Sequence, residues 1–343
     1  MLNFRFHIVS LVAVFLALAI GIIMGSTVID RALVDTLEDQ QRSLRDDLDA
    51  ITEDNRSLRS ELADLQDRGD RLASEGGERL LAGTLSEIPV LVVAARGIDT
   101  SVLDDLDELL VAAGADDQGV LWLTDRFLLE DEDDVAGLAE ALALPPTASP
   151  SRLRDVAIER IAAAVRSAVL PAEDAGAEEG AVGEEGAVEE GVLVALREAG
   201  FVEYDAPEGG PDDVADLAVP GSRVLVVSSS RAEAADGEVA LRLARALVAG
   251  PLPGMPDPPV PVLAAEPSVD GEDDDDDGGD PPASFVGALR EEDAGDRLST
   301  VDNLDAFAGR LAAVVALQDL GDGRRGHYGD GPGAQRLVPS PEG

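Results

Sequence analysis

The chain has 343 residues, enough for one large or two modest domains, and 45% of them are hydrophobic although only 3% are aromatic. Its formal net charge is −44, and all 26 basic residues are arginine. This charge argues against a nucleic-acid partner, and the low aromatic content argues against an outer-membrane β-barrel. The absence of cysteine excludes disulfides, thiol nucleophiles and cysteine-ligated metal centres.

An uncharged apolar segment extends from Ile8 to Ile29. At 1.5 Å per helical residue it reaches about 33 Å, enough for a hydrocarbon core of about 30 Å. A cleaved signal peptide is the alternative, because Ala17-Leu18-Ala19 offers a small-residue cleavage site, but the apolar run continues beyond it. The sequence therefore predicts an uncleaved anchor over residues 1–30, in the inner (cell) membrane, with the rest of the chain outside the cytoplasm.

Small residues recur every four positions along the predicted span. Because such a ladder lets two helix backbones approach closely, it predicts that two spans pair. The alternative is that Ala and Gly are simply common in membrane helices. The residues of the ladder are Ala13, Ala17, Gly21 and Gly25.

Residues 31–75 carry a seven-residue apolar repeat, which is typical of a coiled coil. Asn55 at an a position of this repeat would set the register of two parallel chains. The alternative is an amphipathic helix folded back on its own domain, but the other faces of the repeat are charged. The sequence therefore predicts a parallel homodimer or a higher homo-oligomer. Its core positions include Leu37, Leu44, Ile51, Asn55, Leu58 and Leu65.

Apolar strands alternate with amphipathic helices from residue 89 onward, which predicts a Rossmann-like α/β body with a parallel sheet. Two related lobes, or one sheet with a long insertion, both fit. The predicted parts are a first lobe at 86–170, an acidic disordered insertion at 171–191, a second lobe at 192–320 with an acidic loop at 270–280, and a Gly- and Pro-rich tail at 321–343. The predicted strands are 90–95, 119–124, 223–228 and 260–264, and the predicted helices are 101–113, 132–143, 152–169, 189–199, 234–248 and 304–317.

The sequence contains no recognised motif for catalysis or nucleotide binding. The turn from Arg96 to Thr100 has neither the GxGxxG pattern nor the P-loop ending. Ser228 to Ser230 end a strand but lie outside a GxSxG elbow. The aspartates from Asp273 to Asp277 match only the first half of an EF-hand loop, because position twelve is Ser284 rather than Glu. The sequence therefore predicts neither an enzyme nor a bound cofactor.

Two short motifs mark the C-terminal region. Ser299-Thr300-Val301-Asp302-Asn303 precedes a predicted helix, and Gly326-His327-Tyr328-Gly329 follows it. Together with the anchor and the coil, this order resembles the actinobacterial copper transporter family called copper transport outer membrane protein, MctB. The resemblance covers nearly the whole chain, with the acidic segments as departures. It implies a membrane-anchored protein of copper efflux or copper homeostasis, with copper as a transported ion; an outer-membrane location is implied by the family name alone.

The residues themselves provide no evident set of copper ligands. Copper(I) prefers thiolates and thioethers, whereas the chain has no Cys and only three Met. His327 is the candidate metal ligand, although a single His in a Gly-rich tail is more often a turn or packing residue. Asp302 and Asn303 are expected to cap the helix that follows them. The alternative function is a dimeric coiled-coil envelope scaffold or binding module, which holds its body off the membrane for another envelope protein.

Overall fold

The computed structural model describes residues 6–24, 48, 51–53, 55–60, 76–77, 79–170, 185–207, 213–228, 238–249, 260–268 and 284–340. The chain divides into two compact units, Met1–Gly69 and Asp70–Gly343. The second unit contains all the described strands and is called the α/β body below.

Among the described residues of the first unit, one helix is long and apolar enough to cross a membrane. This helix, Phe6–Met24, has 19 residues and a mean hydropathy of 2.7, and none of its apolar window is buried inside the protein. At 1.5 Å per residue it extends about 28 Å, close to the thickness of a hydrocarbon core. A helix of this composition near the N-terminus is consistent with an anchor or a signal sequence. Ala13, Ala17 and Gly21 lie on it, whereas Gly25 lies outside the described residues.

Short helical stretches are described within the predicted coil, at residues 51–53 and 55–60. Ile51 and Leu58 are more than half exposed there, and Asn55 Nδ2 donates a hydrogen bond to the Ile51 carbonyl oxygen at 3.0 Å. The helical form agrees with the predicted repeat, whereas pairing of two chains stays a prediction. The remaining predicted core positions, Leu37, Leu44 and Leu65, lie outside the described residues.

One seven-stranded sheet forms the centre of the α/β body, in the order β3-β2-β1-β4-β5-β6-β7. The strands are β1 (Pro89–Ala95), β2 (Asp116–Leu123), β3 (Val202–Asp205), β4 (Arg223–Val227), β5 (Val262–Ala265), β6 (Ser299–Val301) and β7 (His327–Tyr328). Neighbouring strands are parallel except β2 and β3, which pair antiparallel at one edge. Strands from both predicted lobes join this sheet. Of the two arrangements that the sequence allows, two lobes or one sheet, the structure therefore has the single sheet.

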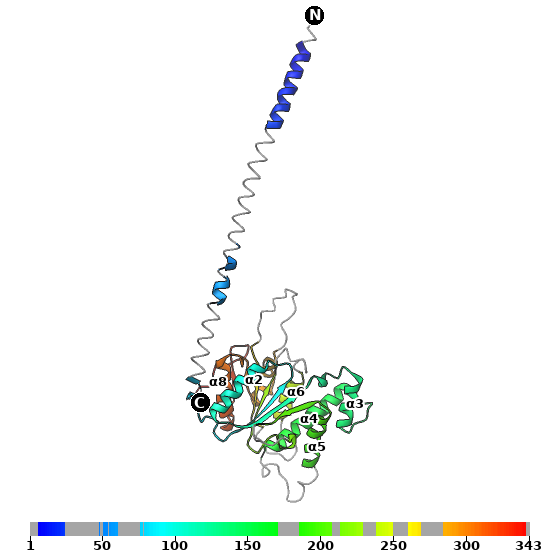
Figure 1. The fold of residues 1–343 in the computed structure, drawn as a ribbon, viewed down its shortest axis with the longest axis vertical. Helices are drawn as coiled ribbons and strands as arrows, with labels where there is room; N and C mark the ends of the chain where they lie inside the picture. The colour runs from blue at the N-terminus through cyan, green and yellow to red at the C-terminus, as the bar shows by residue number, and fades with distance from the viewer. Residues whose placement is uncertain are drawn as a thin grey trace. The chain divides into compact units, whose positions relative to one another are not determined.

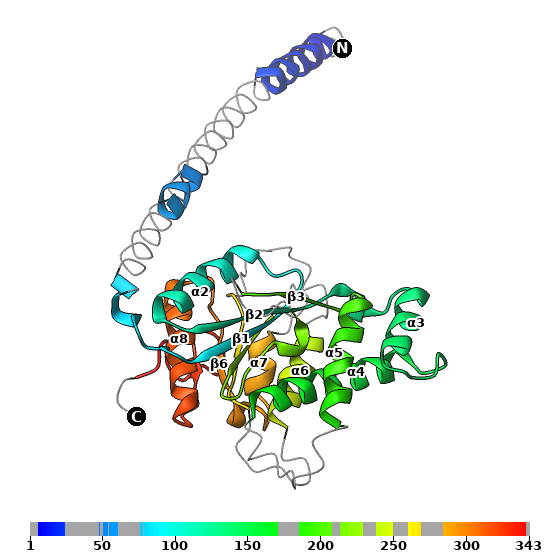
Figure 2. The ribbon, with the colours of Figure 1, turned by 60° about the horizontal axis from the view of Figure 1, so that its bottom comes forward.

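Helices cover both faces of the sheet (Figure 1). They are α2 (Thr100–Ala113), α3 (Glu132–Ala141), α4 (Pro150–Val169), α5 (Glu185–Glu198), α6 (Glu238–Val248), α7 (Phe285–Arg290) and α8 (Phe307–Gly321). Figure 2 shows α2 and α8 on one side of the strands and the group from α3 to α7 on the other. Because both faces are covered, the central strands β1 and β4 are apolar and buried along almost their whole length.

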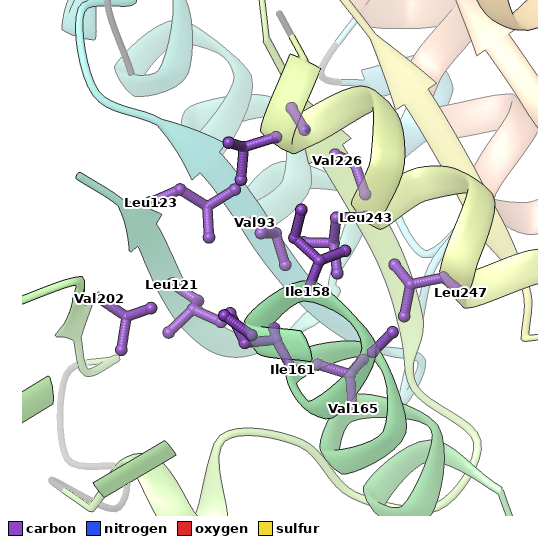
Figure 3. Close-up of a cluster of buried hydrophobic side chains, with 14 of the residues drawn as sticks. Val93, Leu121, Leu123, Ile158, Ile161, Val165, Val202, Val226, Leu243 and Leu247 are labelled. Atoms are coloured by element: carbon purple, nitrogen blue, oxygen red, sulfur yellow. The ribbon is translucent and has the colours of Figure 1, made fainter. Parts of the chain in front are cut away.

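Each face of the sheet packs against its own apolar core. On one face, Val93, Leu121 and Val226 of the strands lie among Ile158 of α4 and Leu243 of α6 (Figure 3). On the other face, residues of the same strands pack against α2 and α8. Successive residues from Val90 to Ala94 of β1 and from Val224 to Val227 of β4 enter opposite cores, because the side chains of a strand alternate between its faces.

Several element boundaries in the body differ from those predicted, and the starts of α5 and α8 are two of them. Helix α5 begins at Glu185, inside the segment predicted as a disordered insertion. Glu and Ala favour a helix there, and the later turns of α5 bury Leu193 and Leu196 in the core. Helix α8 begins at Phe307, three residues later than predicted, with Ala306 as its N-cap. Residues 171–184 and the acidic loop 270–280 lie outside the described residues.

Strands β6 and β7 were not predicted as strands, although they contain parts of both motifs. Their sequences, Ser-Thr-Val and His-Tyr, are short and lack an apolar run. They form because the neighbouring segments of the sheet make hydrogen bonds to their backbone N–H and C=O groups. Glu266 N donates to the Val301 oxygen at 2.9 Å, and Thr300 N donates to the Gly326 oxygen at 3.0 Å. The two motifs therefore meet at this end of the sheet.

Candidate functional site

The two C-terminal motifs lie side by side, although helix α8 separates them in the sequence. Strand β6 pairs in parallel with β7, so that Thr300 is opposite His327 and Val301 is opposite Tyr328. Gly326 N donates a hydrogen bond to Ser299 Oγ at 3.3 Å and thereby joins the first residue of each motif. The residues of the resemblance thus form one structural unit, called the motif site below.

Arg290, the last residue of α7, holds the motif site together. Its Nε donates to Thr300 Oγ1 at 2.8 Å, and its Nη2 donates to the Tyr328 carbonyl oxygen at 2.7 Å. Its Nη1 forms an ion pair with Asp302 Oδ2 and donates to the Pro332 oxygen at 3.0 Å. The side chains of Arg290 and Asp302 are only 4% and 6% exposed. One buried guanidinium therefore links β6, β7 and the segment after β7.

Asp302 does not cap α8, which corrects the expectation for Asp302 and Asn303. Ala306 is the N-cap of α8 and makes no side-chain hydrogen bond to the helix. The carboxylate of Asp302 is instead engaged by Arg290, and it also accepts hydrogen bonds from the N–H groups of Asp330 at 3.0 Å and Gly331 at 3.1 Å. A buried cation attracts a carboxylate more strongly than a helix end does.

His327 lies beside Arg290 in the motif site, with its Nδ1 at 3.0 Å from Thr300 Oγ1. Burial lowers the pKa of His327 below its ordinary 6.5, and the positive charge of Arg290 lowers this pKa further, whereas Asp296 opposes the change. The ring is therefore neutral at pH 7. In the described part of the chain, no group of three or more His, Cys, Asp or Glu side chains could hold a metal ion. His327 thus has no ready set of co-ligands among the described residues.

The ring of His327 is expected to titrate with a midpoint below 6.5. Between the folded and unfolded pKa values the unfolded chain binds more protons, so the stability that neutral His327 contributes is present above pH 6.5 and is lost as pH falls below it. NMR of the imidazole signals measures the midpoint, and His327→Gln assigns the signal, because the chain has only two His residues. A midpoint at or above 6.5 would contradict the burial described here.

A second buried carboxylate belongs to Glu266, which comes directly after β5. Strand β5 is the neighbour of β6 in the sheet. Ser284 Oγ donates a hydrogen bond to Glu266 Oε1. Ser284 is also the N-cap of α7, and the same Oγ accepts a hydrogen bond from the Gly287 N–H at 2.9 Å. Desolvation raises the pKa of Glu266, and the charge of Asp302 also raises it, while hydrogen bonds from Ser284 and the start of α7 lower it. Ser284, which stands at position twelve of the partial EF-hand match, thus fixes α7 against the sheet.

No motif in the sequence pointed to Arg290 or Glu266. A signal for Arg290 was nevertheless present, because it ends the apolar segment Phe285–Leu289 just before the Asp302 motif. A carboxylate at the end of a buried strand needs a cation or several N–H donors. Glu266 offered a similar signal, as the first charged residue after the apolar strand β5.

Three hollows on the α/β body are lined by described residues. A groove of about 960 Å³ lies between α4 and α6, and a pocket of about 350 Å³ lies between α2 and β2. In the latter, the Arg96 guanidinium is 4.1 Å from the centre of the Trp122 ring, and Trp122 Nε1 donates to Asp205 at 2.6 Å. The third, of about 470 Å³, is beside β7, where Tyr328 lies near Arg324.

The whole chain is similar to known proteins. The family model for copper transport outer membrane protein, MctB, matches residues 1–339. Relatives called Copper transporter MctB come from Mycobacterium tuberculosis, Mycobacterium bovis and Mycobacterium leprae. The chain is 27% identical to the first two over 346 residues, which is 99% of this chain and 100% of each relative. It is 27% identical to the third over 345 residues, 98% of this chain and 99% of the relative.

The matched residues include the helix Phe6–Met24 and both strands of the motif site. They also include Arg290, which joins the motifs in the fold. The resemblance predicted from the sequence is therefore confirmed over nearly the full length. The chain belongs to the MctB family of copper transport outer membrane proteins.

Proposed function

We propose that this chain serves copper transport or copper homeostasis at a membrane, with copper as its cargo. The observation that carries the proposal is the length of the match: the family model covers residues 1–339, from the apolar helix to beyond β7. The relatives matched over 99% of this chain are named copper transporters. A likeness of this extent supports a shared role better than a shared fold alone, because unrelated functions often use one fold.

Deletion of the gene is expected to raise both the copper content of the cells and their sensitivity to copper. The direction follows from efflux, since a cell without an exporter retains the metal. Elemental analysis of washed cells and growth at graded copper concentrations measure the two quantities, with complementation by the intact gene as the control. If deletion changes neither quantity, the proposed role in copper homeostasis is wrong.

We also propose that Phe6–Met24 remains part of the protein and anchors it in the inner (cell) membrane, with the α/β body outside the cytoplasm. The 19 residues of this predominantly apolar helix suffice for one crossing. A single apolar helix provides no polar lining for an ion. In this proposal the chain therefore contributes to copper transport as an anchored component, and the helix Phe6–Met24 attaches the protein to the membrane. The intact mass of the mature protein tests this arrangement, because cleavage after Ala19 would remove the anchor.

The proposed anchored form is a parallel homodimer. Two features support it: the ladder of small residues in the span, and the helical repeat whose residues Ile51 and Leu58 are exposed in the single chain. Exposed apolar side chains at d positions are stabilised when a second helix covers them. Asn55 also belongs to this repeat, at an a position.

Cysteine placed at Leu58, which is the core d position three residues after Asn55 in the predicted repeat, is expected to link two chains. The chain has no native Cys, so Leu58→Cys provides a single thiol at the proposed interface, and mild oxidation should produce a disulfide-linked dimer. Ser60→Cys lies at an outward f position of the same repeat and is the matched control, with little or no linkage expected. Non-reducing gel electrophoresis of membranes measures both. Equal linkage at the two sites, or none at Leu58→Cys, would contradict a parallel dimer.

The alternative is a dimeric envelope scaffold or binding module that has no transport activity of its own and binds another envelope protein. One observation is compatible with it: the described residues include no group of three or more His, Cys, Asp or Glu side chains that could hold a metal ion. Copper flux into vesicles containing only the purified chain discriminates the two. Flux above that of empty vesicles would remove the alternative, whereas a copper phenotype without such flux would support it.

A further inference from the structure

The pocket beside β7 is lined mainly by side chains that can donate hydrogen bonds. Its volume is about 470 Å³, and three segments line it: the end of α8 with the turn that follows, strand β7, and the segment after β7. Asp319 is the acidic residue among the described lining residues. An anion in this pocket would therefore meet donors from all three segments. The donors are Arg324, Arg325, Tyr328, Gln335, Arg336 and Ser340.

Arg324 is neutralised by carboxylates and adds no net charge to the pocket. Its guanidinium pairs with Asp319 and also with Asp322, the latter at 2.9 Å. Asp322 acts on Arg223 as well, because desolvation lowers the pKa of Arg223 and the charge of Asp322 opposes that change. Two guanidinium groups thus balance two carboxylates in this part of the structure.

Arg325 and Arg336 supply the positive charge that remains. Arg325 is half-buried, and it donates through Nε to the Arg297 carbonyl oxygen at 2.9 Å and through Nη1 to the Gly323 carbonyl oxygen at 3.2 Å. Arg336 is exposed. Neither of the two forms an ion pair with a described residue. Because a carbonyl contact orients a guanidinium without neutralising it, the pocket keeps a positive charge in a chain whose formal net charge is −44.

The Tyr328 hydroxyl is a further donor, and its ring is held in place. Tyr328 is only 8% exposed, and its phenol lies directly against Gly326, where a methyl group would overlap the hydroxyl. Desolvation raises the pKa of Tyr328 above its ordinary 10.0, and Asp319 raises it further, whereas Arg336 and Arg324 oppose the change. The hydroxyl therefore keeps its proton at pH 7 and can donate it in a hydrogen bond.

We propose that the pocket beside β7 binds the phosphate group of a phosphomonoester. Guanidinium groups bind phosphate through paired N–H donors. The terminal oxygens of a phosphomonoester point in different directions and suit donors on three segments, whereas the two oxygens of a carboxylate lie in one plane. The volume lies within the range of about 300–1,000 Å³ for ligand sites, so the group that carries the phosphate can enter as well. This site is separate from the proposed copper role, because a positive pocket repels a metal cation.

Calorimetric titration of the full chain in phosphatidylcholine nanodiscs tests the proposal, at about 0.15 M salt, where the Debye length of about 8 Å screens distant acidic groups. Glycerol phosphate is expected to bind, inorganic phosphate to bind more weakly, and acetate not to bind at the same concentrations. Nanodiscs with phosphatidic acid distinguish the source of the monoester, with phosphatidylglycerol nanodiscs of matched surface charge as the control. A fall in the apparent affinity for glycerol phosphate with phosphatidic acid alone assigns the pocket to a lipid headgroup, and equal affinity in the two assigns it to a soluble monoester.

Arg336→Gln is expected to weaken the binding of glycerol phosphate about tenfold, because it removes a charged donor that makes no ion pair with a described residue. Tyr328→Phe removes only the hydroxyl and should weaken binding about threefold. The matched control is Arg152→Gln on α4, since Arg152 is also exposed and its side chain forms no ion pair with a described residue. Its affinity should equal that of the unmodified chain.

Asp322→Asn provides a variant with the opposite expected effect. Asp322 is exposed and pairs with Arg324, a residue of the pocket lining, so its neutralisation should tighten binding about threefold. A gain of affinity cannot come from a failure to fold. Absence of glycerol phosphate binding, equal affinities of Arg336→Gln and Arg152→Gln, or weaker binding by Asp322→Asn would each overturn the proposal. So would acetate or inorganic phosphate that binds as tightly as glycerol phosphate, because the pocket would then be a general anion site.

Discussion

Asp302→Ala is expected to lower the free energy of unfolding of the α/β body by about 3–5 kcal/mol, because it leaves the Arg290 guanidinium buried without its counter-charge. The same change removes the acceptor of the Asp330 and Gly331 N–H groups. Urea unfolding followed by the fluorescence of Trp122, the only tryptophan of the chain, measures the loss in the body. Trp122 is buried in the folded state and so reports its unfolding.

An exposed ion pair provides the control for Asp302→Ala. In the Arg245–Glu292 pair both side chains are more than one-third exposed, and Glu292→Ala is expected to change stability by only about 0–1 kcal/mol. Arg290→Met, alone and combined with Asp302→Ala, completes a double-mutant cycle, in which the double variant should lose less than the two single losses added together. Losses of the same size for Asp302→Ala and Glu292→Ala would contradict the buried pair.

Gly329→Ala is expected to destabilise the α/β body by about 2–4 kcal/mol. Gly329 has φ of 122°, a conformation that side-chain-bearing residues rarely adopt, and a methyl group there would overlap Asp302 Oδ1. The substitution therefore adds backbone strain and pushes on the carboxylate that Arg290 holds. The same urea and fluorescence experiment measures the effect.

Substitutions at two other glycines separate the backbone strain of Gly329→Ala from the overlap of its methyl group with Asp302. Gly221 has φ of 90°, and no atom lies within 4 Å of the position that a methyl group would take there, so Gly221→Ala should show the backbone strain alone, about 1–2 kcal/mol. Gly191 lies within helix α5 with equally open space, and Gly191→Ala should stabilise by about 0.5–1 kcal/mol. If Gly329→Ala is no worse than Gly221→Ala, the close approach to Asp302 is wrong.

The strands that the sequence predicted are those with long apolar runs. Strands β1 and β4 lie at the centre of the sheet and are buried on both faces, so their composition reveals them. Strand β3, four residues with Glu203 and Asp205 exposed, lies at an edge and shows no such run. Strands β6 and β7 exist because their neighbours complete their hydrogen bonds, and local sequence carries little of that information.

The motif residues could be found from the sequence, but their roles could not. Asp302 follows a rule for helix caps, yet its carboxylate is taken by Arg290, which reaches it from a different helix. Such a pairing depends on the sheet order, because β5 and β6 place the two segments together. His327 could be singled out as a rare residue, whereas its contact with Thr300 follows from the pairing of β6 and β7.

The segment after β7 completes the edge of the sheet. Gln335 N donates to the His327 oxygen at 2.8 Å, and Gly329 N donates to the Arg336 oxygen at 2.9 Å, so the chain returns to cover β7. An uncovered strand edge is a template on which other chains add. A chain shortened to end before Gln335 would therefore expose β7, and its α/β bodies would be prone to edge-to-edge aggregation.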